Sequence, residues 1–243
     1  MPTALITGSN RGLGLALVQT ALAQGWRVLA TVRPTADTAA LRDLGDADRL
    51  SIHTMDLMDF ATIDQLGATL SGAAIDVLLS NGAITGTPNT AFGNTDYEVW
   101  ADLNRANAMA PMKLAEALAD HVAASARKTM FFISSRIGPT PNFGYVDYRA
   151  TKSALSQVVL QIALALRDRG VIASCAHPGW VATKAAAGPG ALAPDESAQM
   201  LWQIITRLTM DDSGKFFDPD GTTLPIVTQQ HDAKPYGMTQ PVR

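Results

Sequence analysis

Short β-rich runs alternate with longer helical runs along almost the whole chain. The β-rich runs lie at 3–8, 26–32, 50–53, 75–83, 128–135, 171–179 and 214–217. The helical stretches between them lie at 12–25, 36–46, 59–70, 95–124, 145–169 and 194–208. Such alternation requires crossover connections, which make the strands parallel and cover both faces of the sheet with helices. We therefore expect an α/β fold with a doubly wound parallel sheet of about seven strands.

The composition narrows the classes of protein to which this chain can belong. Its 243 residues include 19 Lys and Arg against 22 Asp and Glu, a formal net charge of −3. This balance indicates neither a nucleic acid nor a lipid surface as partner. With 47% hydrophobic residues the chain can bury a sizeable core. Because no linker divides it, we expect one domain over 1–243, of which 225–243 is a largely irregular tail.

The expected location is the cytoplasm. Cys175 is the one cysteine of the chain, so it cannot form an internal disulfide, and its apolar surroundings predict a buried, inert thiol. The opening "MPTALITGSNRG" lacks the basic leader and long apolar run of an export signal. The most apolar later stretch, "SALSQVVLQIALALRDRG", is too short and too polar to cross a bilayer.

A glycine-rich loop, "TGSNRGLG" (7–14), joins the first expected strand to the first expected helix. Glycine lets the backbone turn tightly and approach a ligand closely. The amides and the positive dipole end of the following helix form a natural seat for pyrophosphate. The spacing is GxxxGxG and not the commoner GxGxxG, and a tight turn alone would also explain it. Its place at the carboxyl end of a strand favours dinucleotide binding.

Tyr148 and Lys152, in "YRATK", lie one helical turn apart. A free tyrosine has a pKa near ~10, and a neighbouring ammonium lowers the pKa of a phenol. The pair is therefore suited to proton transfer at neutral pH. However, Tyr145 and Arg149 have the same spacing, and either pair could simply form the polar edge of an amphipathic helix.

A GxxxGxG loop followed by YxxxK resembles the short-chain dehydrogenase/reductase family in its short single-domain form, whose fold is a Rossmann-like sheet. The resemblance covers roughly 3–225. The segment "MDDSGKFFDPDGTTLP" (210–225) is similar to one branch in particular, the C-factor and sniffer-like carbonyl reductases. The resemblance implies an oxidoreductase that acts on small carbonyl or alcohol substrates.

The resemblance also distinguishes Tyr148 from Tyr145. The family places a catalytic serine thirteen residues before its tyrosine. Counted back from Tyr148 this position is Ser135, whereas from Tyr145 it is Phe132, which has no hydroxyl. Ser134 lies on the alternate face of the strand. The catalytic residues implied are thus Ser135, Tyr148 and Lys152.

A fourth catalytic position in the family is a helix asparagine that holds a water of the proton relay. Asn104, in "ADLNRAN", is the expected residue, and Asn107 is the second candidate. In the family's mechanism the serine stabilises the oxyanion, and the tyrosine is the general acid or base.

The resemblance implies cofactor contacts in every loop at the carboxyl edge of the sheet. The family's "NNAG" appears as "SNGA" (80–83), in which Asn81 matches and Ser80 replaces an asparagine. A Pro-Gly turn in "HPGWVAT" should wrap the nicotinamide. The full set comprises Gly8, Asn10, Arg11, Gly12, Leu13, Gly14, Arg33, Asp56, Leu57, Asn81, Gly82, Tyr148, Lys152, Pro178, Gly179, Val181 and Thr183.

Two arginines indicate which of the two cofactors, NADP(H) or NAD(H), the chain uses. Arg33 follows the second strand, where NAD-preferring relatives usually have an acidic residue, and Arg11 lies in the glycine loop. Guanidinium groups suit a ribose 2′-phosphate. We expect NADP(H), with NAD(H) as the alternative, because either arginine could be a solvated surface charge.

Ile137, Phe143 and Trp180 should line the substrate pocket, and their apolar character predicts a hydrophobic ketone or aldehyde. The stretch 184–193 is either a lid or a simple connector. No two histidines have metal-ligand spacing, so we expect no catalytic metal. His177 is explained by the Pro-Gly turn that follows it.

The sequence thus predicts an NADPH-dependent carbonyl reductase, equally a reversible alcohol dehydrogenase, with Tyr148 as general acid or base. One alternative is a non-catalytic NADP(H)-binding sensor. A sugar-nucleotide epimerase needs GxxGxxG, and this spacing fails at Arg11. Apolar residues on several faces of 95–124 and 145–169 predict a homodimer or homotetramer.

Overall fold

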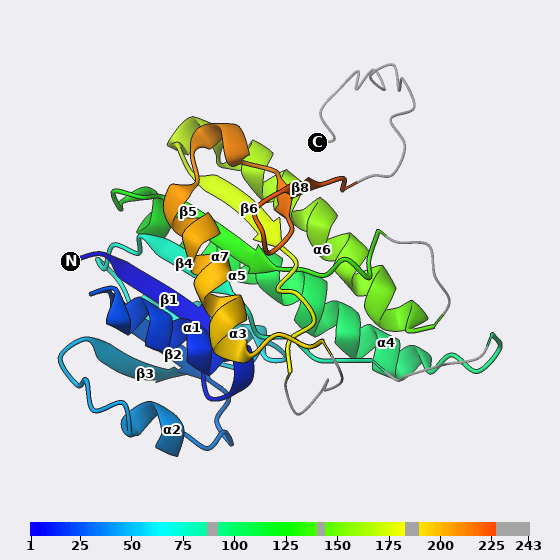
Figure 1. Ribbon diagram of the computed structural model, residues 1–243, viewed down its shortest axis with the longest axis horizontal. Coiled ribbons are helices and arrows are strands. Elements are labelled where there is room, and N and C mark those ends of the chain that lie inside the picture. Colours follow the sequence, from blue (N-terminus) through cyan, green and yellow to red (C-terminus); the bar gives the residue numbers. More distant parts are fainter. Residues whose placement is uncertain (87–91, 140–143, 183–189, 227–243) are drawn as a thin grey trace.

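A computed structural model describes residues 1–86, 92–139, 144–182 and 190–226. Its strands form one sheet of order β3-β2-β1-β4-β5-β6-β7-β8 (Figure 1). All neighbours pair in parallel except β7 and β8. The strands are β1 (Thr3–Thr7), β2 (Arg27–Val32), β3 (Leu50–Thr54), β4 (Val77–Ser80), β5 (Thr129–Ile133), β6 (Ile172–Ala176), β7 (Phe216–Phe217) and β8 (Thr223–Leu224). The doubly wound α/β prediction is confirmed, and the sequence pattern missed only the short antiparallel strand β8.

Helices cover both faces of this sheet. They are α1 (Gly12–Ala23), α2 (Ala39–Arg42), α3 (Phe60–Thr69), α4 (Tyr97–Asn104), α5 (Ala110–Ala123), α6 (Val146–Ala165) and α7 (Pro194–Arg207). Figure 1 shows α1 and α7 side by side across one face. The opposite face is packed by α3, α5 and α6. The α6 helix, which carries the tyrosine–lysine pair, packs against this face of the sheet through its buried side.

The core divides at the sheet because successive strand side chains point to opposite faces. Ala4 and Ile6 of β1 belong to the core beneath α1 and α7, whereas Leu5 belongs to the core beneath α3, α5 and α6. On the first side, Trp26 and Trp202 meet edge to face with their ring centres 5.1 Å apart, a favourable aromatic geometry. The parallel strands at the centre of the sheet are thus buried on both faces, whereas the edge strand β3 is partly exposed.

The single helix expected at 95–124 is interrupted. Between α4 and α5 the chain makes a π-helical turn, η1 (Arg105–Met109). Pro111 follows within the first turn of α5. Proline has no N–H, so it cannot donate to the carbonyl of Asn107, four residues earlier, and the regular bonding ladder breaks there. Such π turns often occur at functional sites.

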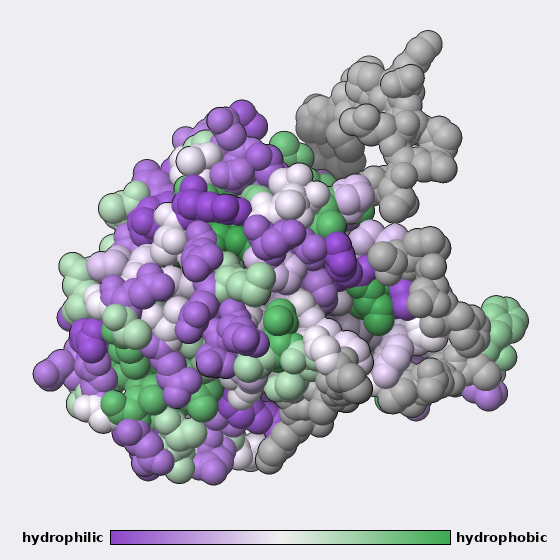
Figure 2. Space-filling model, in the orientation of Figure 1, coloured by the Kyte–Doolittle hydropathy of each residue, from purple (hydrophilic) through white to green (hydrophobic). Residues whose placement is uncertain are grey.

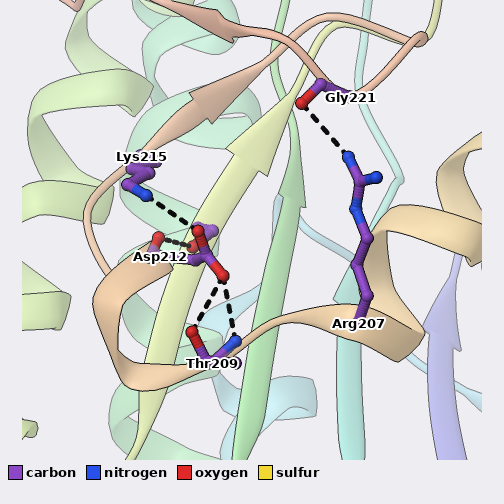
Figure 3. A network of polar contacts seen from close by, with 6 residues as sticks. Arg207, Thr209, Asp212, Lys215 and Gly221 are labelled. Atoms are coloured by element: carbon purple, nitrogen blue, oxygen red, sulfur yellow. Dashed lines mark hydrogen bonds and ion pairs between the residues drawn. The ribbon is translucent and has the colours of Figure 1, made fainter.

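The C-terminal part of the described chain is tied back to the sheet by polar contacts (Figure 3). Asp212 accepts hydrogen bonds from the backbone N–H and the hydroxyl of Thr209 at 3.0 and 3.1 Å, and it pairs with Lys215 at 2.8 Å. Arg207 donates to the carbonyl of Gly221 at 3.1 Å. These contacts hold the β7–β8 hairpin in place. The expected irregular tail lies largely outside the described residues.

Candidate active site

The loops that follow β1 and β4 are joined at the centre of the sheet's carboxyl edge. The Thr7 hydroxyl oxygen accepts from the backbone N–H groups of Asn81 and Gly82, each at 2.9 Å. The Asn81 side chain donates in turn to the Thr7 carbonyl at 2.9 Å. Strand order reverses between these two strands, and open α/β sheets bind ligands at such a point. The "SNGA" loop is therefore fixed against the glycine loop despite its altered sequence.

The glycine loop leaves no room for a side chain at Gly8 or Gly14. Gly8 and Gly12 have φ values of 67° and 53°, in the left-handed region that favours glycine. A Cβ atom on Gly14 would lie 2.0 Å from the Gly8 carbonyl oxygen. Within the described chain, no side chain caps the start of α1 and no acidic residue lies in its first turn. The bare amides and dipole of α1 fit a pyrophosphate group.

The ends of β2 and β3 contribute the residues expected around an adenosine. Arg11 and Arg33 are both exposed and follow the neighbouring strands β1 and β2. Asp56 follows β3, and its Oδ1 accepts from the Met58 N–H at 2.9 Å, so it also stabilises its own turn. Leu57 lies against Gly82, where a Cβ atom would be 3.1 Å from Leu57 Cδ1.

A hollow of about 480 Å³ opens beside Arg33, between β3 and the chain that leads into α2. Leu50, Ile52, Arg33 and Arg42 belong to its lining. Figure 2 shows hydrophobic residues gathered at the lower left of the molecule, over the region of β3 and α2. The arginine expected at a ribose thus borders an open, partly apolar surface.

Tyr148 and Lys152 face one another on α6. The Lys152 Nζ lies 5.6 Å from the centre of the Tyr148 ring. Lys152 is only 3% exposed, and its Nζ donates to the Ile133 carbonyl at the end of β5, at 3.0 Å. Tyr145 instead precedes the helix in a left-handed conformation, with φ 53°. The two tyrosines that spacing could not distinguish therefore lie in different local structures.

Burial is the main cause of the shifted pKa values of Tyr148 and Lys152. It raises the pKa of Tyr148 to about 12 and lowers the pKa of Lys152 to about 8, an effect that Cys175 partly opposes. The sequence predicted that the ammonium lowers the tyrosine pKa, but in the folded protein desolvation, which disfavours both charged forms, raises it. At neutral pH Tyr148 keeps its proton and Lys152 is mostly charged.

The two serines after β5 have different environments. Ser134 is 2% exposed and its hydroxyl lies 3.3 Å from that of Ser156 and 3.4 Å from the Lys152 carbonyl. Ser135 is half-buried, and its Oγ accepts from the Ile137 N–H at 3.2 Å. An oxygen that accepts this bond still has its own O–H to donate. Ser135 is thus the serine with a proton to offer a ligand.

The fully buried asparagine of this region is Asn107, the second candidate of the sequence, and not Asn104, the expected residue. Asn107 is fully buried in η1, accepts from the Ile84 N–H at 2.9 Å and donates to the Ile84 carbonyl at 2.8 Å. Its Nδ2 also reaches Oγ1 of Thr151 on α6, at 3.3 Å. Asn104 is half-buried, and its side chain makes no hydrogen bond to the described residues. Pro111, four residues after Asn107, was the available sequence signal.

The Pro-Gly turn after β6 is held from two sides. The Pro178 carbonyl accepts from the Ser197 hydroxyl at 2.6 Å, and Val181 forms an isolated bridge with Leu192. Gly179 has φ 82°, and a Cβ atom there would lie 2.5 Å from Leu192 Cδ1. Trp180, expected in the substrate pocket, is 53% exposed.

His177 precedes this turn. Burial, and secondarily the charge of Arg136, lower its pKa to about 4, so its imidazole is uncharged at neutral pH. Arg136 pairs with Asp218 at 2.8 Å and so links the Ser135 segment to the C-terminal hairpin. Ile137 is half-buried near Ser135, whereas Phe143 and Thr183 lie outside the described residues.

Among the residues that the structure describes, no three His, Cys, Asp or Glu side chains are placed to share a metal ion. No helix of this part of the chain is long and apolar enough to cross a membrane.

The family model for short chain dehydrogenase matches residues 2–190. The chain belongs to the short-chain dehydrogenase family. A relative by sequence is C-signal of Myxococcus xanthus, 30% identical over 154 residues that cover 62% of this chain and 92% of that protein. The resemblance drawn from the glycine loop and YxxxK is thereby confirmed.

Solved structures of carbonyl reductases are similar over almost the full length. The carbonyl reductase Sniffer of D. melanogaster has a TM-score of 0.86 and 27% identity, covering 92% of this chain and 99% of that one. The NADPH-bound carbonyl reductase from chicken fatty liver has a TM-score of 0.83 and 26% identity, covering 92% and 98%. This short-chain dehydrogenase is therefore an oxidoreductase of CH–OH and C=O groups that uses a nicotinamide cofactor.

Proposed function

We propose that the chain is an NADPH-dependent carbonyl reductase in which Tyr148 is the general acid. The observation that carries the proposal is the Tyr148–Lys152 pair, with the Lys152 Nζ 5.6 Å from the tyrosine ring and bonded to the Ile133 carbonyl, two residues before the half-buried Ser135. A protein that only bound a dinucleotide would not need a proton donor beside a hydroxyl and an ammonium. The reverse direction, alcohol oxidation, would use Tyr148 as base.

The dinucleotide would be held along the carboxyl edge of the sheet. The amides at the start of α1 would bind its pyrophosphate, and Asp56 and Leu57 would lie at the adenine. Asn81, Gly82, Pro178 and Gly179 would border the nicotinamide half, where Lys152 would bind ribose hydroxyls. When bound in its reduced form, this cofactor supplies the hydride for the carbonyl carbon.

The side chains of this chain stabilise the charge and supply the proton. Ser135 donates its O–H to the substrate oxygen, where negative charge develops. Tyr148, with its pKa raised by burial to about 12, stays protonated at neutral pH and gives its proton to that oxygen. The Lys152 ammonium stabilises the tyrosinate that results.

The proton returned to Tyr148 would come from solvent along α6 and η1. We assign the relay asparagine to Asn107 in place of Asn104. The supporting observations are its burial, its bonds to both backbone groups of Ile84 and its contact with Thr151, one residue before Lys152. Because Pro111 cannot donate to the Asn107 carbonyl, this oxygen is available for a water.

NADP(H) is the proposed cofactor form, and a hydrophobic ketone or aldehyde the proposed substrate. Arg11 and Arg33 are exposed at neighbouring strand ends, where a ribose 2′-phosphate would find two guanidinium groups. The similar carbonyl reductase from chicken is an NADPH-bound structure. On the substrate side, Ile137 and Trp180 provide apolar surface near Ser135 and the Pro-Gly turn.

The experiment compares NADPH oxidation by the native protein and Tyr148→Phe with an aryl ketone, a β-ketoester and an aryl aldehyde. We expect turnover to fall at least about a hundredfold in Tyr148→Phe, because general acid catalysis contributes roughly that much, while NADPH binding persists. Tyr145→Phe is the matched control and should stay near native. Equal activity in native and Tyr148→Phe would refute the role of Tyr148. Tight NADPH binding without any turnover would favour a sensor.

A further inference from the structure

Arg149, the neighbour of Tyr148 on α6, joins two segments that lead to different catalytic side chains. Its Nε donates to the Gly144 carbonyl at 2.7 Å, and its Nη1 donates to the Ile137 carbonyl at 2.8 Å. Ile137 stands two residues after Ser135, and Gly144 stands four residues before Tyr148. A single guanidinium therefore connects the serine side of the site to the tyrosine side.

The serine side is a tight turn packed against α6. The Ile137 N–H donates to the Ser135 Oγ at 3.2 Å, and the Gly138 N–H donates to the Ser135 carbonyl at 3.2 Å. A Cβ atom on Gly138 would lie 2.9 Å from the Ser153 backbone nitrogen, so the turn rests directly on the helix. Any shift of Ile137 would move the N–H that orients the Ser135 hydroxyl.

The tyrosine side is the strained entry into α6. Gly144 and Tyr145 both have positive φ values, 93° and 53°. The Arg149 N–H donates to the Tyr145 carbonyl at 2.8 Å, so the backbone and the side chain of Arg149 both hold this entry. A left-handed tyrosine costs energy and persists only where surrounding contacts enforce it. The first turn of α6 positions Tyr148.

We propose that Arg149 is a positioning residue that sets the distance between the Ser135 hydroxyl and Tyr148. The planar guanidinium offers several donors in fixed directions, which matches two carbonyls presented from separate segments. A lysine at this place would keep the charge but not the rigid fork. The proposal rests on the proposed function, in which Ser135 and Tyr148 act on the same carbonyl oxygen.

The test compares Arg149→Met, Arg149→Lys and native protein, with Arg167→Met as control. Arg167 is exposed just beyond the C-terminal end of α6, and its side chain makes no hydrogen bond to the described residues. NADPH-binding sites are counted by fluorescence titration, and turnover of para-nitrobenzaldehyde is expressed per binding site. This normalisation removes any loss that comes only from unfolded protein.

For Arg149→Met we expect kcat/KM per binding site to fall about 10- to 100-fold, mainly through kcat, as misplacement of catalytic groups by about 1 Å can do. The Kd for NADPH should change less than about threefold, and Arg149→Lys should recover part of the activity. Arg167→Met should remain within about twofold of native, as most exposed substitutions do. Unchanged kcat/KM per site in Arg149→Met would overturn the proposal, because a merely structural residue would lower only the folded fraction.

Hydrogen–deuterium exchange separates failure of this proposal from failure of the proposed function. In Arg149→Met, exchange should accelerate in the two joined segments, 136–139 and 144–146, and not at the far end of α6. If the native protein turns over none of the carbonyl probes, the proposed function fails. The hydrogen–deuterium exchange of Arg149→Met then remains as the test of the positioning role. Exchange equal to that of Arg167→Met would then overturn the positioning role.

Discussion

The side chain of Asn107 donates to Oγ1 of Thr151 at 3.3 Å and so joins the π-helical turn η1 to the helix that carries Tyr148 and Lys152. The Thr151 hydroxyl in turn donates to the Tyr148 carbonyl at 2.8 Å. The same asparagine also holds both backbone groups of Ile84, just beyond the "SNGA" loop. One buried amide therefore connects three parts of the candidate site.

Replacement of Asn107 by Ala should reduce both stability and turnover. The Ile84 N–H and C=O would each lose a buried partner, so we expect the free energy of unfolding to fall by about 2 kcal/mol. We expect kcat to fall about tenfold or more, because the proposed relay loses its anchor. Urea unfolding and NADPH oxidation measure the two effects. Asn104→Ala is the control, with changes within about 0.5 kcal/mol, and a larger loss of kcat there would restore the assignment to Asn104.

The local sequence pattern does not distinguish Asn104 from Asn107. Both asparagines occur in one helical pattern, and spacing alone treats that pattern as continuous. The interruption follows from Pro111, which was visible in the sequence as a break four residues after Asn107. That Asn107 points to Ile84 and Thr151, however, depends on how η1 packs between α6 and the loop after β4. This packing is tertiary and leaves no local signature.

The rate of carbonyl reduction should fall above about pH 8. Reduction requires a protonated Tyr148 and a charged Lys152, whose pKa values are about 12 and about 8. Both groups carry their protons below about pH 8, so kcat/KM should be level there, and it should then decline as Lys152 loses its charge. Lys152→Met should be much slower, without this decline. A native profile that stays level to about pH 10 would contradict the prediction.

Asp212→Ala should destabilise the C-terminal hairpin in a pH-dependent way. Burial favours the neutral acid, but hydrogen bonds from Lys215 and Thr209 outweigh it and hold the pKa of Asp212 below its usual value. A lowered carboxyl pKa contributes stability above the unfolded pKa, and this contribution is lost as pH falls through the folded pKa. Urea unfolding should show a loss of about 1 kcal/mol at pH 7, and this loss should shrink as the pH falls below about 4, the ordinary pKa of an aspartate.

Asp211→Ala is the control for this measurement, since Asp211 is exposed in the same short turn. Its free energy of unfolding should stay near native at both pH values. An equal loss in Asp211→Ala would mean that the turn responds to any change of charge. A loss in Asp212→Ala that persists undiminished at low pH would show that packing, and not the carboxylate, is responsible.

Gly14→Ala should disrupt the glycine loop. The added methyl would lie 2.0 Å from the Gly8 carbonyl oxygen, and because this atom belongs to the backbone, no side-chain rotation can relieve the clash. We expect a loss of about 3 kcal/mol or more, as for other overpacked sites, and NADPH binding at least about tenfold weaker. Gly25→Ala is the control. Gly25 has φ 78° but no atom near its Cβ position, so it should cost about 1 kcal/mol and leave the Kd for NADPH unchanged.

The glycine loop and the tyrosine–lysine pair were predictable because each depends on residues close in sequence at a strand–helix junction or on one helix face. The raised pKa of Tyr148 was not, since it results from desolvation in the folded protein. The role of Arg149 was equally hidden. In the sequence Arg149 follows Tyr145 at the same spacing as Lys152 follows Tyr148, which indicates no structural role. Only the folded turn brings the Ile137 and Gly144 carbonyls to its guanidinium.

Arg33→Ala and Arg11→Ala should each weaken NADPH selectively. A charge-assisted bond to a 2′-phosphate contributes about 1.5–3 kcal/mol, so we expect the KM for NADPH to rise about 10- to 100-fold. The KM for NADH should remain near native, because NADH lacks this phosphate. Arg27→Ala, exposed at the opposite end of β2, is the matched control. If both cofactors weaken equally in Arg33→Ala, the guanidinium acts on a part that NADH and NADPH share, and the selectivity for NADP(H) must originate elsewhere.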